Sequence, residues 1–432
     1  MSRRKAATGL GVPALAAWAL LAPGLLVLLH AWQGNAYWEY SDGVYALTGR
    51  LVLHGSSLYR DVAAAQPPPI YYAGAGLLGL FGDSVSGLRW GLSLVALATS
   101  SLVLACAWRL TRSRVAAVLA GVTALATPWA LREHAQLVPE TFAAPLMLGA
   151  ALAGARGGRG GAVLAGVLAA LAVAFKLAFV LPAAAVLLAS GRRGRALMSF
   201  FAAGAVLAGA FLLAFGEPLL DGAVRAQRQT GTAALHYVGG LWAQAGWNLL
   251  PLLACAALVW PARRMLADAA LLRTLAAAAL GSLLLLLTLF KHGSYLTVVV
   301  AIEPPLLCLA AAGVTAAART RATGRLLLAG GAAVLAALQV GSLLAAPGDP
   351  RLFTRPLAAS GPAWTLSPSG VDRAAAAIRA CPPSDPTSGP PYLAFAAGRR
   401  IAGDQPDQFI VEHAAVLARF RAAVARDQPR CP

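Results

Sequence analysis

The stretch AVLAGVLAALAVAFKLAFVLPAAAVLLAS, residues 162–190, decides what kind of protein this chain is. It carries a single charged side chain, Lys176, near its centre. As one helix it would extend about 43 Å at 1.5 Å per residue, against a bilayer core of about 30 Å. A single crossing would also place Arg192 on the opposite side from the other basic loops. We therefore expect two short helices that meet near Lys176, with the amine lifted to the outer membrane interface.

Similar apolar runs recur along the whole chain. Hydrophobic residues make up 59% of it and charged residues 12%, whereas soluble domains carry about 25% charged residues. Clusters of Lys and Arg separate these runs, and the positive-inside rule places such short basic loops in the cytoplasm. They lie at residues 3–5, 109–114, 156–159, 192–195, 263–273 and 319–325. The net charge of +18 therefore reflects membrane topology, and we do not expect nucleic acid as a partner.

An even number of crossings must separate neighbouring basic clusters. We therefore expect an all-α polytopic protein of about eleven transmembrane helices in the cell membrane, with a cytoplasmic N-terminus. The expected helices cover residues 10–31, 88–108, 114–131, 139–155, the pair within 162–190, then 196–215, 241–260, 272–290, 294–313 and 326–346. If residues 67–82 also crossed the membrane, the basic cluster at 109–114 would lie outside the cell. We therefore interpret them as an interfacial or re-entrant segment.

The chain is expected to divide into a membrane domain, residues 1–346, and an extracytoplasmic C-terminal domain, residues 347–432. The second is predicted to be a small α+β unit, with a helix at 371–380, a strand at about 391–397 and an amphipathic helix at about 410–426. Cys381 and Cys431 lie in this tail, where an oxidising exterior would permit a disulfide between them.

Acidic residues are distributed unevenly across this topology. Of 17 Asp and Glu residues, only Asp268 falls in a cytoplasmic loop and only Glu303 within a helix, where a structural role is expected. Two explanations fit: the outer loops are longer and more polar, or the outer face holds the chemistry.

The first outer loop, residues 32–87, carries the most informative motifs. They are WEYSDGVY at 38–45, LYRD at 58–61 and QPPPIYY at 66–72, followed by Arg89 in the next helix. This order resembles the first outer loop of GT-C glycosyltransferases, in particular the protein O-mannosyltransferase and aminoarabinose lipid A transferase group. The paired short helices around Lys176, and Lys291 to Tyr295 followed by Glu303-Pro304-Pro305, extend the resemblance.

Two departures from that group's pattern concern the site. Gly43 stands after Asp42 where the group often has Glu. Gln66 and Tyr71 flank the prolines where the group commonly has cations, so one positive charge near a sugar phosphate is missing. Lys176, Arg132 or Lys291 would have to replace it.

The resemblance implies an inverting transfer of a sugar from a polyprenyl-phosphate donor to an extracytoplasmic glycan, lipid or protein. Asp42 would be the general base, since a carboxylate at the membrane surface can take a proton from an acceptor hydroxyl; the alternative is an Asx turn with Gly43. Donor phosphate contacts are expected from Arg89, Arg132, Lys176 and Lys291, although Arg89 and Lys176 would equally suit lipid headgroups. Acceptor or donor contacts are expected from Glu39, Asp61, His134, Glu140 and Tyr295, with loop capping as the alternative for Asp61.

No metal or other cofactor is required by this interpretation, and a divalent metal stays possible without support from the residues. His134 has no second His or Cys nearby, and side-chain cations can stabilise a phosphate leaving group without a metal. Two other function classes remain open. A transporter or flippase for an envelope lipid or glycan would show internal repeats and charges near the bilayer midplane. A non-catalytic envelope assembly protein would have a filled site.

Overall fold

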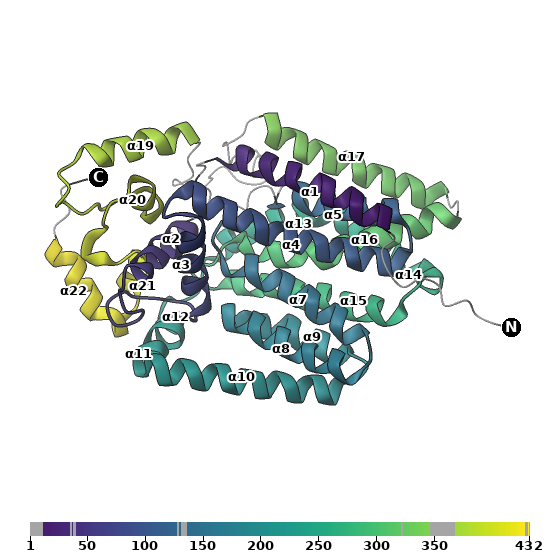
Figure 1. The fold of residues 1–432 in the computed structure, drawn as a ribbon, viewed down its shortest axis with the longest axis horizontal. Helices are drawn as coiled ribbons and strands as arrows, with labels where there is room; N and C mark the ends of the chain where they lie inside the picture. Colours follow the sequence, from purple (N-terminus) through teal and green to yellow (C-terminus); the bar gives the residue numbers. More distant parts are fainter. Residues whose placement is uncertain are drawn as a thin grey trace.

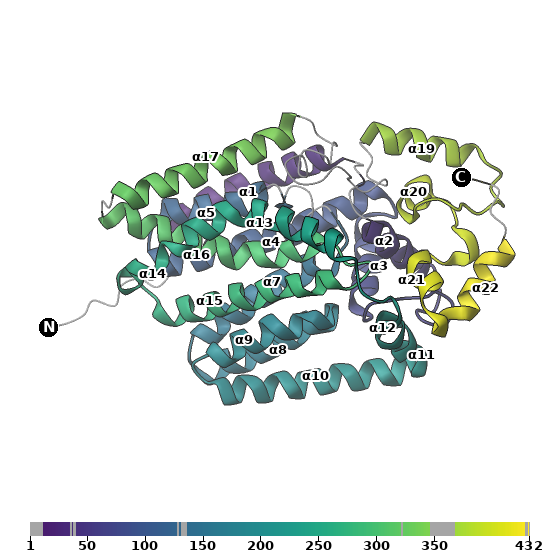
Figure 2. The same cartoon turned by 180° about the vertical axis from the view of Figure 1, so that it is seen from behind.

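A computed structural model describes residues 12–34, 37, 40–127, 129–130, 136–320, 323–345, 368–427 and 431 of the chain. Long helices lie side by side along one axis, and short helices cover one end of this bundle (Figure 1). The reverse view shows the same arrangement (Figure 2). We call residues 368–427 and 431 the cap.

Every predicted span coincides with a helix of the bundle. These helices are α1 (Val12–Gln33), α4 (Val85–Thr111), α5 (Arg114–Ala126), α7 (Pro139–Ala155), α8 (Arg159–Phe175), α9 (Val180–Ala189), α10 (Arg193–Phe215), α13 (Leu235–Ala257), α15 (Ala269–Leu283), α16 (Val299–Thr320) and α17 (Thr323–Ala345). A 3₁₀ helix, η4 (Leu284–Phe290), continues α15. Another, η5 (Leu296–Val298), precedes α16. The expected domain boundary near residue 346 lies outside the described residues.

Several helices have the length and composition of membrane spans. Five stretches of the described chain qualify: Val85–Thr111, Arg193–Phe215, Leu235–Pro261, Ala269–Phe290 and Leu296–Thr320. Helix α10 presents Phe201, Val206 and Leu213 to its surroundings, and Leu213 is 91% exposed. Such a surface suits lipid rather than water. The expected number of about eleven crossings stays a prediction.

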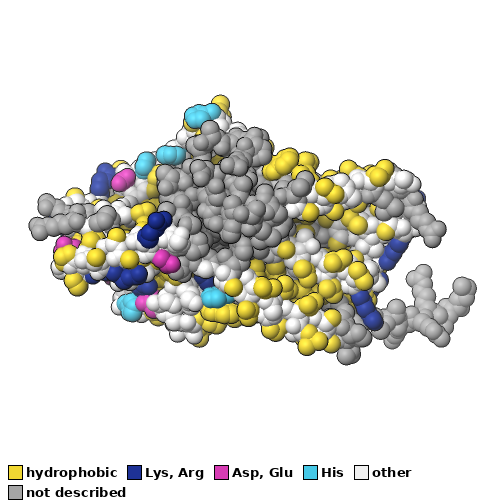
Figure 3. Space-filling view, turned by 90° about the horizontal axis from the view of Figure 1, so that it is seen from above, with side chains coloured by type: hydrophobic (Ala, Val, Ile, Leu, Met, Phe, Trp, Pro, Cys, Tyr) yellow, Lys and Arg dark blue, Asp and Glu magenta, His cyan; other side chains and the backbone are white. Residues whose placement is uncertain are grey.

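The basic loops gather at the end of the bundle opposite the cap. Hydrogen bonds tie them together: Arg109 pairs with Asp268, Arg319 donates to the Thr111 carbonyl, Arg192 to the Gly157 carbonyl and Arg273 to the Ala189 carbonyl. Figure 3 shows acidic, basic and His side chains together at the cap end, apolar ones over the bundle, and basic ones again at the far end. The grouping inferred from charge is confirmed for the described basic loops, the cluster at residues 3–5 lies outside the described residues, and the membrane side that each end faces stays a prediction.

The break at Lys176 is confirmed. Helix α8 ends at Phe175, and Lys176 is extended, with φ −155° and ψ 123°. The chain then makes one turn, η1 (Leu177–Phe179), and continues as α9. The length mismatch in the sequence was therefore a reliable signal of two helices.

Two short helices of the first loop lie under the cap. They are α2 (Tyr40–Leu53) and α3 (Pro69–Phe81). The 13 residues of α3 would extend only about 20 Å, too short for a bilayer core. This length agrees with the interpretation of residues 67–82 as an interfacial or re-entrant segment.

Helices are the regular elements of the described cap, which otherwise holds two isolated β-bridges, from Thr387 to Ile401 and to Cys431, so the α+β prediction is not confirmed. The expected helix at 371–380 is α19 (Pro368–Ala380), but the expected strand at about 391–397 is α20 (Pro391–Ala397). Its apolar run fits either structure, and the local signals at its ends decide: Pro391 opens a helix and left-handed Gly398, with φ 68°, closes it. The expected helix at about 410–426 is split into α21 (Gln408–His413) and α22 (Ala418–Asp427), with η7 (Ala415–Leu417) between them.

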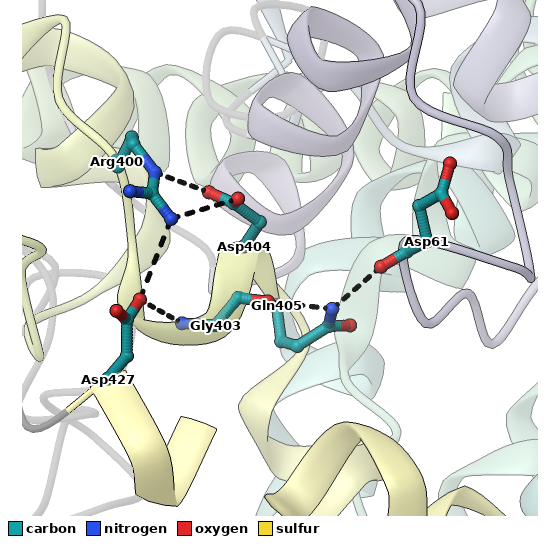
Figure 4. Close-up of polar contacts among 6 residues, drawn as sticks. All are labelled: Asp61, Arg400, Gly403, Asp404, Gln405 and Asp427. Atoms are coloured by element: carbon teal, nitrogen blue, oxygen red, sulfur yellow. Dashed lines mark hydrogen bonds and ion pairs between the residues drawn. The ribbon is translucent and has the colours of Figure 1, made fainter. Parts of the chain in front are cut away.

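Gln405 fastens the cap to the first loop. Its side chain is buried, its Oε1 accepts from the Ala63 N–H at 2.7 Å, and its Nε2 donates to the Asp61 carbonyl at 2.9 Å (Figure 4). Within the cap, Arg400 pairs with Asp404, and Asp427 accepts from the Gly403 N–H at 2.7 Å. A disulfide joins Cys381 and Cys431, a pairing that the sequence had left open.

Replacement of Gln405 by Ala should loosen the cap. It leaves a buried N–H and carbonyl without partners, so we expect unfolding in detergent to lose about 1–3 kcal/mol of stability, measured as a lower melting temperature. Arg400→Gln is the matched control, because its exposed ion pairs contribute at most about 1 kcal/mol. If Gln405→Ala and the unmodified protein had the same melting temperature, the hydrogen bonds of the Gln405 side chain would not be what holds the cap.

Candidate functional site

A cavity of about 330 Å³ lies where the cap meets the bundle. Its wall comes from α2, the 65–67 loop, the start of α7, the break after α8, residues 223–228, the turn between η4 and η5, and α21. The charged lining residues are Glu140, Lys176, Arg228, Lys291 and Asp407. The chain has three lysines, Lys5, Lys176 and Lys291, and two of them line this cavity although Arg is the cation almost everywhere else.

Lys176 and Glu140 form an ion pair in the cavity wall. The Lys176 ammonium lies 2.6 Å from Oε1 of Glu140, and Thr297 donates to the same oxygen at 3.0 Å. Helix α7 begins at Pro139, so Glu140 lies in its first turn, where a carboxylate is favoured by the helix dipole. The second oxygen, Oε2, is buried and finds no hydrogen-bond partner among the described residues. A buried acceptor of this kind calls for a donor from a ligand or water.

Lys291 and Asp407 face the cavity from the bundle and the cap respectively. Burial and the nearby Lys176 lower the pKa of Lys291 to about 8, although Asp407 opposes this shift. Burial raises the pKa of Asp407 to about 6, against the Ile410 N–H and the charge of Lys291. The cavity therefore holds a carboxylate and an amine whose pKa values both lie about one unit from neutral pH.

Asp42 and Arg89 do not line the cavity. Asp42 is fully buried, with Arg89 donating to its two oxygens at 3.2 and 2.6 Å. The Leu137 N–H also donates to Asp42 at 2.7 Å, and Arg89 reaches Tyr392 Oη of the cap at 3.1 Å. Both side chains are buried against each other, which leaves neither of them facing the cavity. The assignments of Asp42 as the base and Arg89 as a phosphate contact both stay predictions, and Asp42 lies within α2 rather than in an Asx turn.

The close packing of the cap explains the unexpected Gly43. A Cβ atom at this position would lie 2.2 Å from the Tyr392 backbone nitrogen. The glutamate expected from the resemblance could not fit there while α20 stays in place. Gly43 therefore allows α2 to lie directly against α20 of the cap.

The remaining predicted residues separate into three groups. Glu140, Lys176, Lys291 and Tyr295 line the cavity together. Asp61 is exposed and accepts from the Ser57 N–H at 2.7 Å, so the loop-capping alternative describes it. Glu39, Arg132 and His134 lie outside the described residues.

Sequence reasoning did not single out Asp407, Tyr40 or Phe409 as site residues, yet all three line the cavity. Asp407 precedes α21 and accepts from the Ile410 N–H at 3.1 Å, as an N-cap does. This signal was visible in the sequence, but it indicates only a helix start. Among the described residues, no group of three or more His, Cys, Asp or Glu side chains could hold a metal ion.

The chain has the fold of ArnT from Cupriavidus metallidurans. A crystal structure of that protein bound to undecaprenyl phosphate matches with a TM-score of 0.63 and 14% identity, over 94% of this chain and 89% of the other. The apo structure matches with a TM-score of 0.64 and 15% identity over the same shares. The resemblance to the aminoarabinose lipid A transferase group is thus confirmed at the level of the fold. No family model and no curated protein sequence matches the chain.

Removal of one member of the Asp42–Arg89 pair should lower the folding stability of the protein. Arg89→Met leaves a buried carboxylate without its cation, so we expect a loss of about 3–5 kcal/mol, measured by thermal unfolding in detergent. The double variant Asp42→Asn with Arg89→Met should recover part of this loss. Strictly additive losses, or Asp42→Asn that folds normally but has no activity, would favour a direct catalytic role instead.

Proposed function

We propose that this chain, which shares the ArnT fold, is a membrane glycosyltransferase that takes a sugar from a polyprenyl-phosphate donor. The carrying observation is that Lys176 and Lys291 meet in one cavity at the end of an apolar bundle. The undecaprenyl phosphate in one ArnT structure supports the ligand class. The acceptor would be an extracytoplasmic glycan, lipid or protein.

The two lysines would bind the donor phosphate as point charges. Leu177 lines the cavity beside Lys176 and is also 49% exposed on the bundle surface. A polyprenyl chain could therefore lie along the apolar surface while its phosphate enters the cavity. Arg228, a third cation of the lining, would add positive charge to the same region.

The reaction would be a single displacement with inversion. The acceptor oxygen attacks the anomeric carbon, the bond from that carbon to the phosphate oxygen breaks, and polyprenyl phosphate leaves. Lys176 and Lys291 would stabilise the charge that develops on the leaving group, so no metal is required. The cap would face the cell exterior, because the basic loops gather at the opposite end and the positive-inside rule assigns that end to the cytoplasm.

Neither alternative class gains support from the described residues. A transporter would be expected to place free charges near the middle of the bundle, but Glu303 lies in the second turn of α16, is buried and accepts a hydrogen bond from Thr127 at 2.7 Å. A non-catalytic relative would be expected to have a filled site, but this cavity has a volume of about 330 Å³.

Neutral replacement of either cavity lysine should weaken lipid binding. We expect Lys176→Met and Lys291→Met each to raise the Kd for undecaprenyl phosphate about tenfold or more, since a hydrogen bond to a charged group contributes about 1.5–3 kcal/mol. Binding can be measured by microscale thermophoresis in detergent. Arg225→Met is the control, because Arg225 pairs with Glu217 and Asp221 and does not line the cavity. Unchanged affinity in both lysine variants would contradict the proposed phosphate site.

The pH dependence of binding offers a separate check on Lys291. Its lowered pKa of about 8 means that the ammonium is present below this pH and lost above it. Affinity for undecaprenyl phosphate should therefore fall between about pH 7.5 and 9. In Lys291→Arg this fall should disappear, because guanidinium stays charged over the whole range. The same fall in both proteins would assign the titration to another group.

A further inference from the structure

An inverting transfer needs a base beside the acceptor, and two carboxylates line the cavity. Glu140 is fully buried and shares one oxygen between Lys176 and Thr297. Asp407 is half-buried and has no ion pair with a described residue. The hydrogen bond recorded for its side chain comes from the Ile410 N–H to Oδ1. Oδ2 is therefore available to an incoming hydroxyl.

The backbone on either side of Asp407 is fixed against the membrane domain. The Tyr40 hydroxyl donates to the Pro406 carbonyl at 3.4 Å, and the Gln405 side chain bridges the cap to the first loop. On the other side, Phe409 packs against the ring of His292, with ring centroids 5.2 Å apart. The bond to Ile410 also orients the carboxylate at the start of α21. A base held in this way loses little freedom when the acceptor binds.

We propose that Asp407, supplied by the cap, is the general base that activates the acceptor. This assignment rests on the proposed function. Oδ2 takes the proton of the acceptor hydroxyl while the acceptor oxygen forms a bond to the anomeric carbon. The bond from that carbon to the phosphate oxygen breaks, and its electron pair leaves with the polyprenyl phosphate. Asp407 ends protonated, and the phosphate ends beside Lys176 and Lys291.

The surroundings of Asp407 suit a base that works near neutral pH. Lys291 faces it from the bundle, the hydroxyls of Tyr40 and Tyr71 come from α2 and α3, and the cap contributes the Ile410 N–H. The other charged residues of the lining are Glu140, Lys176 and Arg228. Burial raises the pKa of Asp407 to about 6, so the carboxylate is ionised at pH 7 yet more basic than an exposed one.

The test compares Asp407→Asn with Glu412→Gln, which removes an exposed acid from the same helix. Asparagine also caps helices well, so α21 should persist in the variant. The purified proteins are assayed for sugar release from undecaprenyl phosphate carrying a panel of pentoses and hexoses, with native membrane extract as the acceptor source. We expect Asp407→Asn to lower kcat about 100-fold or more, as loss of a general base does. Its affinity for undecaprenyl phosphate should be equal or higher, and Glu412→Gln should behave like the unmodified protein.

The pH profile separates a base from a merely structural residue. The unmodified protein should lose kcat as the pH falls through about 6, and this acidic limb should be absent from the residual activity of Asp407→Asn. An active unmodified protein with an equally active Asp407→Asn variant would overturn the role of Asp407 alone. An unmodified protein that releases no sugar from any donor, although it binds undecaprenyl phosphate, would overturn the proposed function and this role with it.

Discussion

The buried ion pair between Asp42 and Arg89 is the interaction on which the cap end of the molecule depends. It joins α2 to α4, accepts the Leu137 N–H just before α7, and reaches Tyr392 of the cap. Desolvation of two charges offsets much of their attraction, so such a pair contributes more to fixing geometry than to net stability. Four segments that are distant in sequence are thereby held together, and two of them, α2 and the start of α7, also line the cavity.

The two ends of the bundle use different cations, arginine at the basic end and lysine in the cavity. Arginine serves at the basic end, where Arg319, Arg192 and Arg273 each donate to a backbone carbonyl of a neighbouring segment. Lysine serves in the cavity, where its ammonium is a compact point charge. Its pKa shifts readily when the group is buried. Lys291 illustrates this response, because burial and Lys176 bring its pKa close to the physiological range.

The sequence predicted the helices of the bundle well, because each depends on local apolar length and on charge parity. Lys176 is the clearest case, since the excess length around it had a single physical solution. The strand expected at about 391–397 was wrong because the run is too short for periodicity to decide. Asp42 was singled out as a base, a role that stays a prediction, whereas its pairing with Arg89, 47 positions away, was not foreseen because pairing at that distance leaves no local pattern. Asp407 was missed for the same reason: its relation to Lys291 exists only in three dimensions.

The disulfide between Cys381 and Cys431 has a consequence for biogenesis. The ring that it closes spans α20, α21 and α22, and therefore encloses the whole stretch of cap that lines the cavity. Such bonds form in oxidising compartments and are rare in the reducing cytoplasm. In the proposed orientation, with the cap outside the cell, the disulfide would form only after the cap has crossed the membrane, so that completion of the cavity wall would follow translocation.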